Sequence, residues 1–183
     1  MNLITIFLLA ISLLTDPAGL KVGQKAPDFT GTDQNGNRIS LYESLKSHKV
    51  ILTFYRGAWC KYCMGQFKDY QDSITYFNNN GAMLMAVSPE HEEGIQKTAK
   101  ISNASFSLIH DDGLEIMHSF EVISTERVKE YQEGKEASGE DNQHKFLPVP
   151  ATYVINQNGF IEYVFFDPNY KNRVTVKSLL RYL

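Results

Sequence analysis

Two stretches of the chain carry apolar side chains on both faces, which is the pattern of strands buried in the middle of a sheet. Residues 50–56 (VILTFYR) are rich in β-branched and aromatic side chains and are apolar except at Thr53 and the terminal arginine. Residues 82–88 (AMLMAVS) form a second apolar run. A shorter apolar stretch, FSLIH, covers residues 106–110. Strands of this kind are typical of parallel sheets covered on both faces.

Between these strands the apolar positions recur with the period of a helix. The residues that follow Cys63 on one helical face are Phe67, Tyr70, Ile74 and Phe77. Their steps of four and three predict one helix, which the Asn-Gly pair at residues 80–81 ends. Residues 89–101 (PEHEEGIQKTAKI) predict a second helix with acids in its first turn. This order of strands and helices predicts an α/β fold with parallel strands.

Asn-Gly pairs mark a hairpin at each end of this pattern. Residues 27–41 (PDFTGTDQNGNRISL) hold two short extended pieces around QNGN, and residues 152–166 hold TYVI and FIEYVFF around NQNG. Asn-Gly favours the tight turns of hairpins. Ser40 is a suitable N-cap for the short helix LYESLKS, and VKSLLRYL predicts a last helix.

The length and composition fit a single domain, which we place at residues 21–183. Residues 124–145 are polar and charge-mixed, and we interpret them as a surface insertion before the closing hairpin. The net charge of −3 offers no basic field for a nucleic acid, so we expect no such partner. The sequence does not indicate an oligomeric state.

Residues 1–20 form an apolar leader. The uncharged run at residues 3–14 is shorter than the ~20 residues that span a bilayer and suits the h-region of a secretory signal. No Lys or Arg precedes this run and no clear small-x-small cleavage site follows, so an apolar helix packed on the domain is an alternative. We expect an exported, for example periplasmic, protein; the alternative is a cytoplasmic one.

The two cysteines of the chain, Cys60 and Cys63, follow the first buried strand. The strand leads into a helix that begins near Cys60, where unpaired N–H groups and the helix dipole favour an anion such as a thiolate. A thiol in that place is more acidic and more reactive. Cys63 lies one turn further along, close enough to bridge Cys60. We predict a redox pair with an exposed nucleophile, Cys60, and a shielded partner, Cys63.

Other interpretations of the pair are two buried thiols, a structural disulfide or a zinc site. A zinc site needs about four ligands, and the sequence has no second Cys-x-x-Cys and no His-x-x-x-His. The histidines are scattered singly, and we expect each to be solvated or structural: His48, His91, His110, His118 and His144. We therefore predict no metal and no cofactor.

Three neighbours bear on the chemistry of the pair. Trp59 would shield the sulfurs on one side, or pack as ordinary core. Lys61 puts a positive charge beside Cys60, which favours the thiolate and a more oxidising disulfide. Arg56 can hydrogen-bond a bound oxygen with its planar donor fork, or form a salt bridge at the strand end.

The segments PDFTGTDQNGNRISL, VILTFYRGAWCKYC and LPVPATYVINQNGFIEYVFFDPNY together resemble the peroxiredoxin-like branch of the alkyl hydroperoxide reductase and thiol-specific antioxidant (AhpC/TSA) family. The resemblance covers residues 21–183. It implies a thioredoxin-like fold, with a central mixed β-sheet flanked by helices, and reduction of peroxides by cysteine thiols. By motif, Cys60 resembles the nucleophile and Cys63 its partner.

The same resemblance implies a place for the substrate. Pro150 in PVPATYVI matches the proline that precedes the strand facing the cysteines in thioredoxin-like folds, usually after a cis peptide bond. Such a proline shapes a backbone edge along which a substrate can lie. Trp59, Val149 and Pro150 are therefore the expected substrate-binding residues.

The site also departs from the family pattern. Typical members carry Pro-x-x-x-Thr-x-x-Cys, whereas residues 55–59 are YRGAW and both the Pro and the Thr are absent. The arginine that many members place just before the strand TYVI is absent too. Relatives of this branch often have Pro where Lys61 stands. The site is thus more thioredoxin-like than peroxidase-like.

The leading hypothesis is a thiol peroxidase that acts on a peroxide with Cys60, Cys63 and Arg56, and that thioredoxin or another dithiol regenerates. The rival is a thiol-disulfide oxidoreductase that acts on protein disulfides. A third hypothesis is a non-catalytic binding module that uses the insertion at residues 124–145 as its contact surface.

Overall fold

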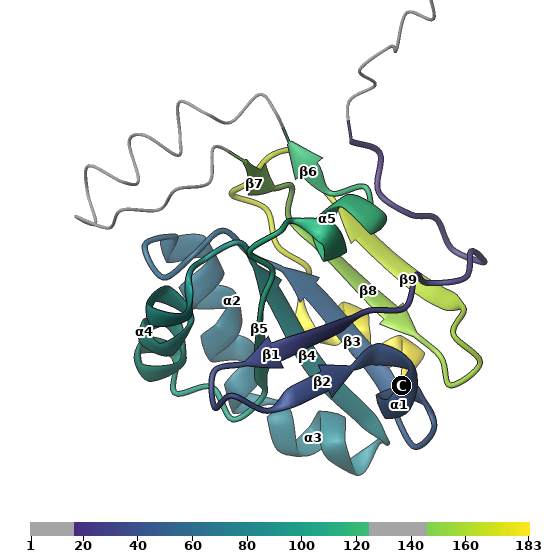
Figure 1. Cartoon of the computed structure of the whole chain (residues 1–183). Coiled ribbons are helices and arrows are strands. Elements are labelled where there is room, and N and C mark those ends of the chain that lie inside the picture. Colours follow the sequence, from purple (N-terminus) through teal and green to yellow (C-terminus); the bar gives the residue numbers. More distant parts are fainter. Residues whose placement is uncertain (1–16, 125–145) are drawn as a thin grey trace, which may run out of the picture.

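The sheet at the centre of the computed structural model has seven strands in the order β2-β1-β5-β4-β3-β8-β9, within the described residues 17–124 and 146–183 (Figure 1). Its strands are β1 (Thr30–Asp33), β2 (Arg38–Ser40), β3 (Lys49–Phe54), β4 (Ala82–Ser88), β5 (Ser107–His110), β8 (Ala151–Ile155) and β9 (Ile161–Phe166). A separate pair joins β6 (Ile123–Ser124) and β7 (Leu147–Pro148).

The three central strands are parallel, as their apolar pattern predicts. β4 pairs in parallel with both β3 and β5. The outer strands pair antiparallel: β8 with β3, β9 with β8, β1 with β5, and β2 with β1. The carboxyl ends of β3, β4 and β5 therefore meet at one edge of the sheet, where α/β proteins usually place their sites. Both predicted hairpins, β1–β2 and β8–β9, are confirmed.

Helices cover both faces of the sheet. They are α1 (Leu41–Leu45), α2 (Lys61–Asp72), α3 (Ile74–Asn79), α4 (Glu92–Ser102), α5 (Glu115–Ser119) and α7 (Val176–Leu179), followed by a 3-10 turn, Leu180–Tyr182. In β3, Val50 and Leu52 pack in the cluster of α1 and α5, whereas Ile51 packs in the cluster of α2, α3 and α4. This alternation makes the sheet the middle of three layers.

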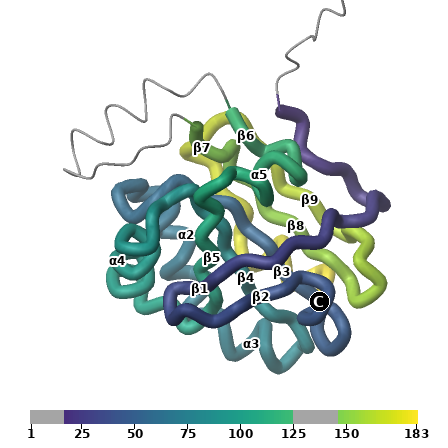
Figure 2. The backbone as a smooth tube through the Cα atoms, viewed as in Figure 1, coloured from purple at the N-terminus to yellow at the C-terminus, as the bar shows by residue number. Residues whose placement is uncertain are grey.

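The segment before β1 is tied to the far end of the sheet. Residues 17–29 run beside the β8–β9 hairpin before they enter β1 (Figure 2). The N–H of Gly23 donates to the carbonyl of Ile161, and the N–H of Ala26 donates to the carbonyl of Gly159, both at 2.8 Å. These bonds protect part of the β9 edge.

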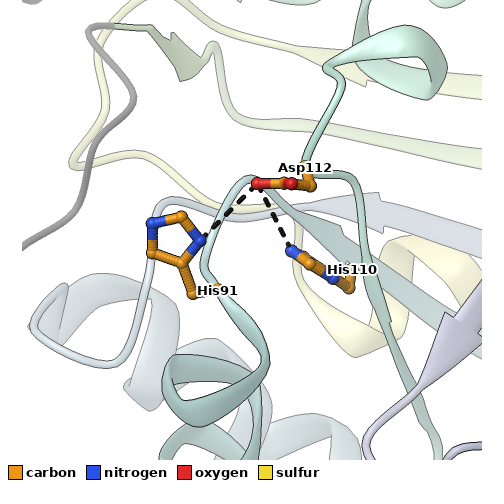
Figure 3. Close-up of side chains that lie close together, drawn as sticks. All are labelled: His91, His110 and Asp112. Atoms are coloured by element: carbon orange, nitrogen blue, oxygen red, sulfur yellow. Dashed lines mark ion pairs between the residues drawn. The ribbon is translucent and has the colours of Figure 1, made fainter.

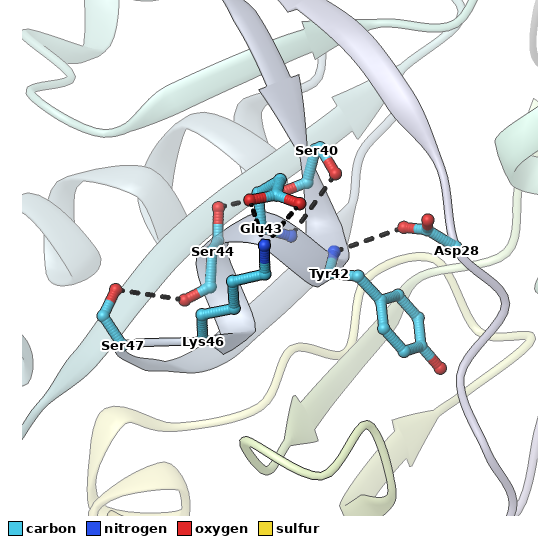
Figure 4. A network of polar contacts seen from close by, with 7 residues as sticks. All are labelled: Asp28, Ser40, Tyr42, Glu43, Ser44, Lys46 and Ser47. Carbon is cyan, nitrogen blue, oxygen red and sulfur yellow. Dashed lines mark hydrogen bonds and ion pairs between the residues drawn. The ribbon is translucent and has the colours of Figure 1, made fainter.

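Helix α1 begins at the predicted cap. Ser40 is the N-cap, and its Oγ accepts from the N–H of Glu43 at 3.4 Å (Figure 4). The N–H of Tyr42 donates to the Asp28 carboxylate at 3.2 Å, and Lys46 forms an ion pair with Glu43. Side chains thus satisfy two of the N–H groups that a helix start leaves unpaired.

Some boundaries differ from the prediction. The single helix expected after Cys63 is two helices, α2 and α3, because Ser73 has φ −105° and ψ 1°, outside the helical range. The apolar periodicity continues across this break, so it could not reveal it. The last helix is shorter than VKSLLRYL suggests, and α5 was not predicted.

Two predictions lie outside the described residues, and both stay predictions. The leader at residues 1–20 is described only from residue 17, and the insertion at 124–145 only at Ser124. None of the helices within the described ranges is long and apolar enough to cross a membrane.

Candidate active site

Cys60 and Cys63 lie at the start of α2, beyond the carboxyl end of β3. Cys60 is the N-cap, and its Sγ accepts a hydrogen bond from the N–H of Cys63 at 3.3 Å. The two sulfurs are joined in a disulfide, with 5.2 Å between the Cα atoms. The predicted position of Cys60 at a helix N-terminus and the bridging of the pair are therefore confirmed.

The predicted exposure of Cys60 is wrong for this disulfide form. Cys60 exposes 3% of its surface and Cys63 none, and both belong to the same apolar cluster as Tyr55 and Phe67. The packing of Cys60 within this cluster, and not its role as a cap, accounts for its burial. Exposure alone therefore does not distinguish the two sulfurs.

Arg173 brings a positive charge to both sulfurs. Its Nη2 lies 3.2 Å from the Sγ of Cys63 and 3.6 Å from the Sγ of Cys60. Its Nη1 donates to the backbone carbonyls of Tyr170 and Asn172, which holds the guanidinium in place. Because a guanidinium keeps its charge at all physiological pH values, Arg173 favours a thiolate in the reduced protein.

Sequence reasoning missed Arg173, which stands 113 positions from Cys60. The register of the sheet explains its arrival: Phe54 pairs with Ala151, and Ala151 pairs with Phe166. The chain that leaves β9 at Phe166 thus emerges at the edge where the cysteine loop begins. Only the length of the closing hairpin could have indicated that Arg173 reaches the cysteines. No local sequence motif indicates it.

Arg56 and Trp59 form a stack beside the pair. Arg56 is buried, and the carbon of its guanidinium lies 4.7 Å from the ring centroid of Trp59 and 4.4 Å from that of Tyr170. Trp59 packs against the cluster that contains both cysteines. Lys61 is exposed, with its Nζ 5.1 Å from the ring centroid of Tyr62. The side-chain hydrogen bonds to the two sulfurs come from Arg173.

A buried carboxylate supports the loop before Cys60. The Oε1 of Glu90 accepts from the N–H of Ala58 at 2.7 Å, and its Oε2 accepts from the hydroxyl of Thr98 at 2.8 Å. Burial, followed by the nearby charge of Glu90, raises the pKa of Tyr55 well above its usual value, so this phenol stays neutral. Glu90 was also missed by sequence reasoning.

Gly57 occupies the position of the missing threonine, three residues before Cys60. Its φ is +146°, and a Cβ there would lie 2.7 Å from the Nε1 of Trp59 and 2.9 Å from the Oε1 of Glu90. A side chain at this position is therefore excluded by both backbone conformation and space. This loop has no room for the threonine of the common motif.

A buried hydroxyl network lies behind the pair. The side-chain amide of Gln66 donates to the Oη of Tyr70 at 2.7 Å, and the hydroxyls of Thr53 and Thr152 are 2.8 Å apart. Burial raises the pKa of Tyr70 to about 12, although the Arg173 charge acts in the opposite direction. The interior next to the pair is thus neutral and hydrogen-bonded.

Val149 and Pro150 come directly before β8, on the same edge of the sheet as the cysteine loop. No peptide bond within the described ranges is cis, so the expected cis bond before Pro150 is wrong. The N–H of Val149 donates to the carbonyl of Val122 at 2.7 Å, and Leu147–Pro148 pairs with β6. The chain therefore enters β8 already extended and makes no tight turn there. Substrate binding by Val149 and Pro150 stays a prediction.

A Cys-x-x-Cys disulfide at the start of a helix that follows a central parallel strand defines a thioredoxin-like dithiol protein. The chain belongs to the AhpC/TSA family, whose sequence profile matches residues 22–164. The resemblance inferred from the sequence is thus confirmed.

The relatives of this chain include proteins named for two different activities. The Helicobacter pylori (strain J99) protein named as the peroxiredoxin bcp is 28% identical over 148 residues, which are 81% of this chain and 89% of that protein. The thiol-disulfide oxidoreductase ResA of Bacillus subtilis is 25% identical over 138 residues, 75% of this chain and 63% of ResA. The structure of peroxidoxin BcpB from Mycobacterium tuberculosis superposes with a TM-score of 0.66 at 22% identity, covering 80% of this chain and 86% of that one. This last likeness confirms the predicted fold.

Proposed function

We propose that the protein is a thiol peroxidase that reduces hydrogen peroxide or alkyl hydroperoxides through Cys60 and Cys63. The observation that carries the proposal is the position of Cys60 at the start of α2, with the Arg173 guanidinium 3.6 Å from its sulfur. Membership of the AhpC/TSA family and the peroxiredoxin name of the Helicobacter relative support a peroxide as substrate.

The reaction has three steps. The Cys60 thiolate attacks one peroxide oxygen, the O–O bond breaks, and the other oxygen takes a proton and leaves as water or an alcohol. Cys60 is then a sulfenic acid, and the thiol of Cys63 condenses with it to release water and form the disulfide. Thioredoxin or another external dithiol reduces this disulfide and becomes oxidised itself. The disulfide of the structure corresponds to the state after the second step.

Arg173 and Arg56 have different roles in this proposal. Arg173 stabilises the thiolate of Cys60 before attack, because its guanidinium faces both sulfurs. Arg56 stacks between Trp59 and Tyr170 and forms one wall of the site. Polarisation of the peroxide by Arg56 and substrate contact by Trp59 are further parts of the proposal.

A stopped-flow measurement tests the proposal. The protein has one tryptophan, Trp59, next to Cys60, so its fluorescence reports oxidation of the pair. Reduced protein mixed with hydrogen peroxide should react much faster than free cysteine does at the same pH, and the Cys60→Ser variant should show no change. A rate no faster than that of free cysteine overturns the proposal.

A second candidate is a thiol-disulfide oxidoreductase acting on protein disulfides. Two observations favour it. The chain is similar to ResA, and the loop at Gly57 has no room for the threonine of the peroxidase motif. Cys60 would attack a substrate disulfide, and Cys63 would release the product. Insulin turbidity in dithiothreitol separates the two candidates, because strong acceleration is expected of the oxidoreductase alone.

A further inference from the structure

Three side chains from two separate segments of the chain meet at the carboxyl ends of β4 and β5. The Nδ1 of His91 lies 3.5 Å from the Oδ1 of Asp112, and the Nε2 of His110 lies 3.8 Å from the same oxygen (Figure 3). All three potential ligand atoms lie within 4.8 Å of one another. The expectation that the histidines are scattered singly is therefore wrong for this pair.

Strand pairing explains the meeting. β4 and β5 are parallel with Ser88 opposite His110, so the residues just after Ser88 lie beside those just after His110. His91 follows Ser88 by three positions, and Asp112 follows His110 by two. No local motif contains this arrangement.

The two separations to Asp112 are longer than ordinary hydrogen bonds and close to those between two ligands of one metal ion. Hydrogen bonds from a ring nitrogen to a carboxylate span ~2.7–3.2 Å. Two ligands of a tetrahedral zinc, each ~2.0–2.1 Å from the metal, lie roughly 3.3 Å apart. A small inward movement of each side chain would therefore close the three atoms around one ion.

His110 supplies a second, independent observation. Its Nε2 is buried and makes no hydrogen bond within the part of the chain that the structure describes, although the atom faces Asp112. A buried nitrogen without a hydrogen-bond partner costs stability, and a bound ion is one recognised explanation for such a group. This unbonded nitrogen is thus one of the three potential ligand atoms of the cluster.

The backbone around the cluster is fixed. The N–H of Asp111 donates to the carbonyl of Ser88 at 3.0 Å, which ties the loop after β5 to the end of β4. The buried carboxylate of Asp111 accepts from the N–H groups of Ile116 and Met117 at 3.1 and 2.8 Å. Asp112 therefore follows directly after a residue that is held by both its backbone and its side chain, which favours a preorganised position.

We propose that His91, His110 and Asp112 bind a divalent transition-metal ion, with Zn²⁺ as the best match. Imidazole nitrogens and a carboxylate suit this ion, and three protein ligands leave a position for water. The side chains expose 38%, 27% and 60% of their surface, so an ion and its water can enter. The dipole of α4, whose N-cap is His91, opposes a cation, and the acids of its first turn, Glu92 and Glu93, offset it.

Metal titration of the full chain without a histidine tag tests the proposal. The protein is kept oxidised, so that the Cys60–Cys63 disulfide cannot supply thiolate ligands. Zn²⁺ is titrated in competition with a chromophoric chelator, and Co²⁺ is used as a spectroscopic probe of ligand geometry. We expect one ion per chain and visible Co²⁺ bands typical of low coordination number.

Variants assign the ligands. His91→Ala, His110→Ala and Asp112→Asn should each weaken Zn²⁺ binding at least about tenfold and remove the Co²⁺ bands, while circular dichroism shows a retained fold. His118→Ala, at an exposed histidine of α5, is the matched control and should bind as wild type does. The proposal is overturned if the oxidised wild type binds no ion, or if the three variants bind as tightly as the His118 variant.

Discussion

Two helices of this protein begin with the same hydrogen bond and serve different purposes. Ser40 at the start of α1 and Cys60 at the start of α2 both have extended backbones, and each side chain accepts from the N–H three residues on, at 3.4 and 3.3 Å. At α1 the neighbours are an exposed ion pair between Glu43 and Lys46. At α2 the neighbours are a second sulfur and the guanidinium of Arg173.

The comparison shows that a helix start does not by itself make a reactive site. Both caps lie in the positive end of a helix dipole, which is the feature that singled out Cys60 in the sequence. What differs is the capping atom, its burial and the cation that faces it. Each of these can be changed separately.

The largest expected effect comes from turning the reactive cap into a structural one. Cys60→Ser keeps a capping oxygen, as at Ser40, but removes the nucleophile, so peroxide consumption should fall at least about 10³-fold. Coupled consumption assays with a dithiol reductant measure this, and circular dichroism checks that α2 persists.

Cys63→Ser is the matched variant of the same pair. It should consume one equivalent of peroxide and stop at a sulfenic acid on Cys60, which mass spectrometry detects with its over-oxidised products. If Cys60→Ser reacts as fast as wild type while Cys63→Ser is inert, the roles of the two sulfurs are reversed.

Removing the cation beside the cap should have the next largest effect. Arg173→Ala removes a charged donor from both sulfurs, which corresponds to roughly 1.5–3 kcal/mol, or about 10- to 150-fold in the rate of peroxide reduction. The thiolate absorbance of the reduced protein should then appear at higher pH than in wild type, and Arg173→Lys should restore part of this shift. Arg181→Ala, an exposed arginine of the last turn, is the control. Equal rates for the Ala variants at 173 and 181 would contradict the role of Arg173.

The support of the loop before Cys60 should matter for stability. Glu90→Ala leaves the N–H of Ala58 and the hydroxyl of Thr98 without their acceptor in a buried place, which should lower the free energy of unfolding by about 1–3 kcal/mol. Urea denaturation measures the change. Gln96→Ala, exposed on the same helix as Thr98, should change it by less than about 0.5 kcal/mol. Similar values for the two variants would show that Glu90 does not hold this loop.

The sequence predicted the parts of this molecule that local patterns control. The strands at 50–56 and 82–88, the turns at the Asn-Gly pairs, the Ser40 cap and the helix start at Cys60 all depend on residues close together in the chain. Arg173 and Glu90 could not be found in this way, because strand register and the return of β9 bring them to the cysteine loop. The break between α2 and α3 at Ser73 was not predicted for a different reason: the apolar face of the helix continues through it.

The smallest effect is expected at the structural cap itself. Ser40→Ala removes the acceptor of the Glu43 N–H and should lower the free energy of unfolding by about 1 kcal/mol, without changing the rate of peroxide reduction. Ser47→Ala, at an exposed serine just after the same helix, is the control and should change stability by less than about 0.5 kcal/mol. Thermal and urea denaturation of both variants measure the difference. If Ser40→Ala slows peroxide reduction as well, the two helix starts are coupled through the sheet, and the separation between a structural and a chemical cap fails.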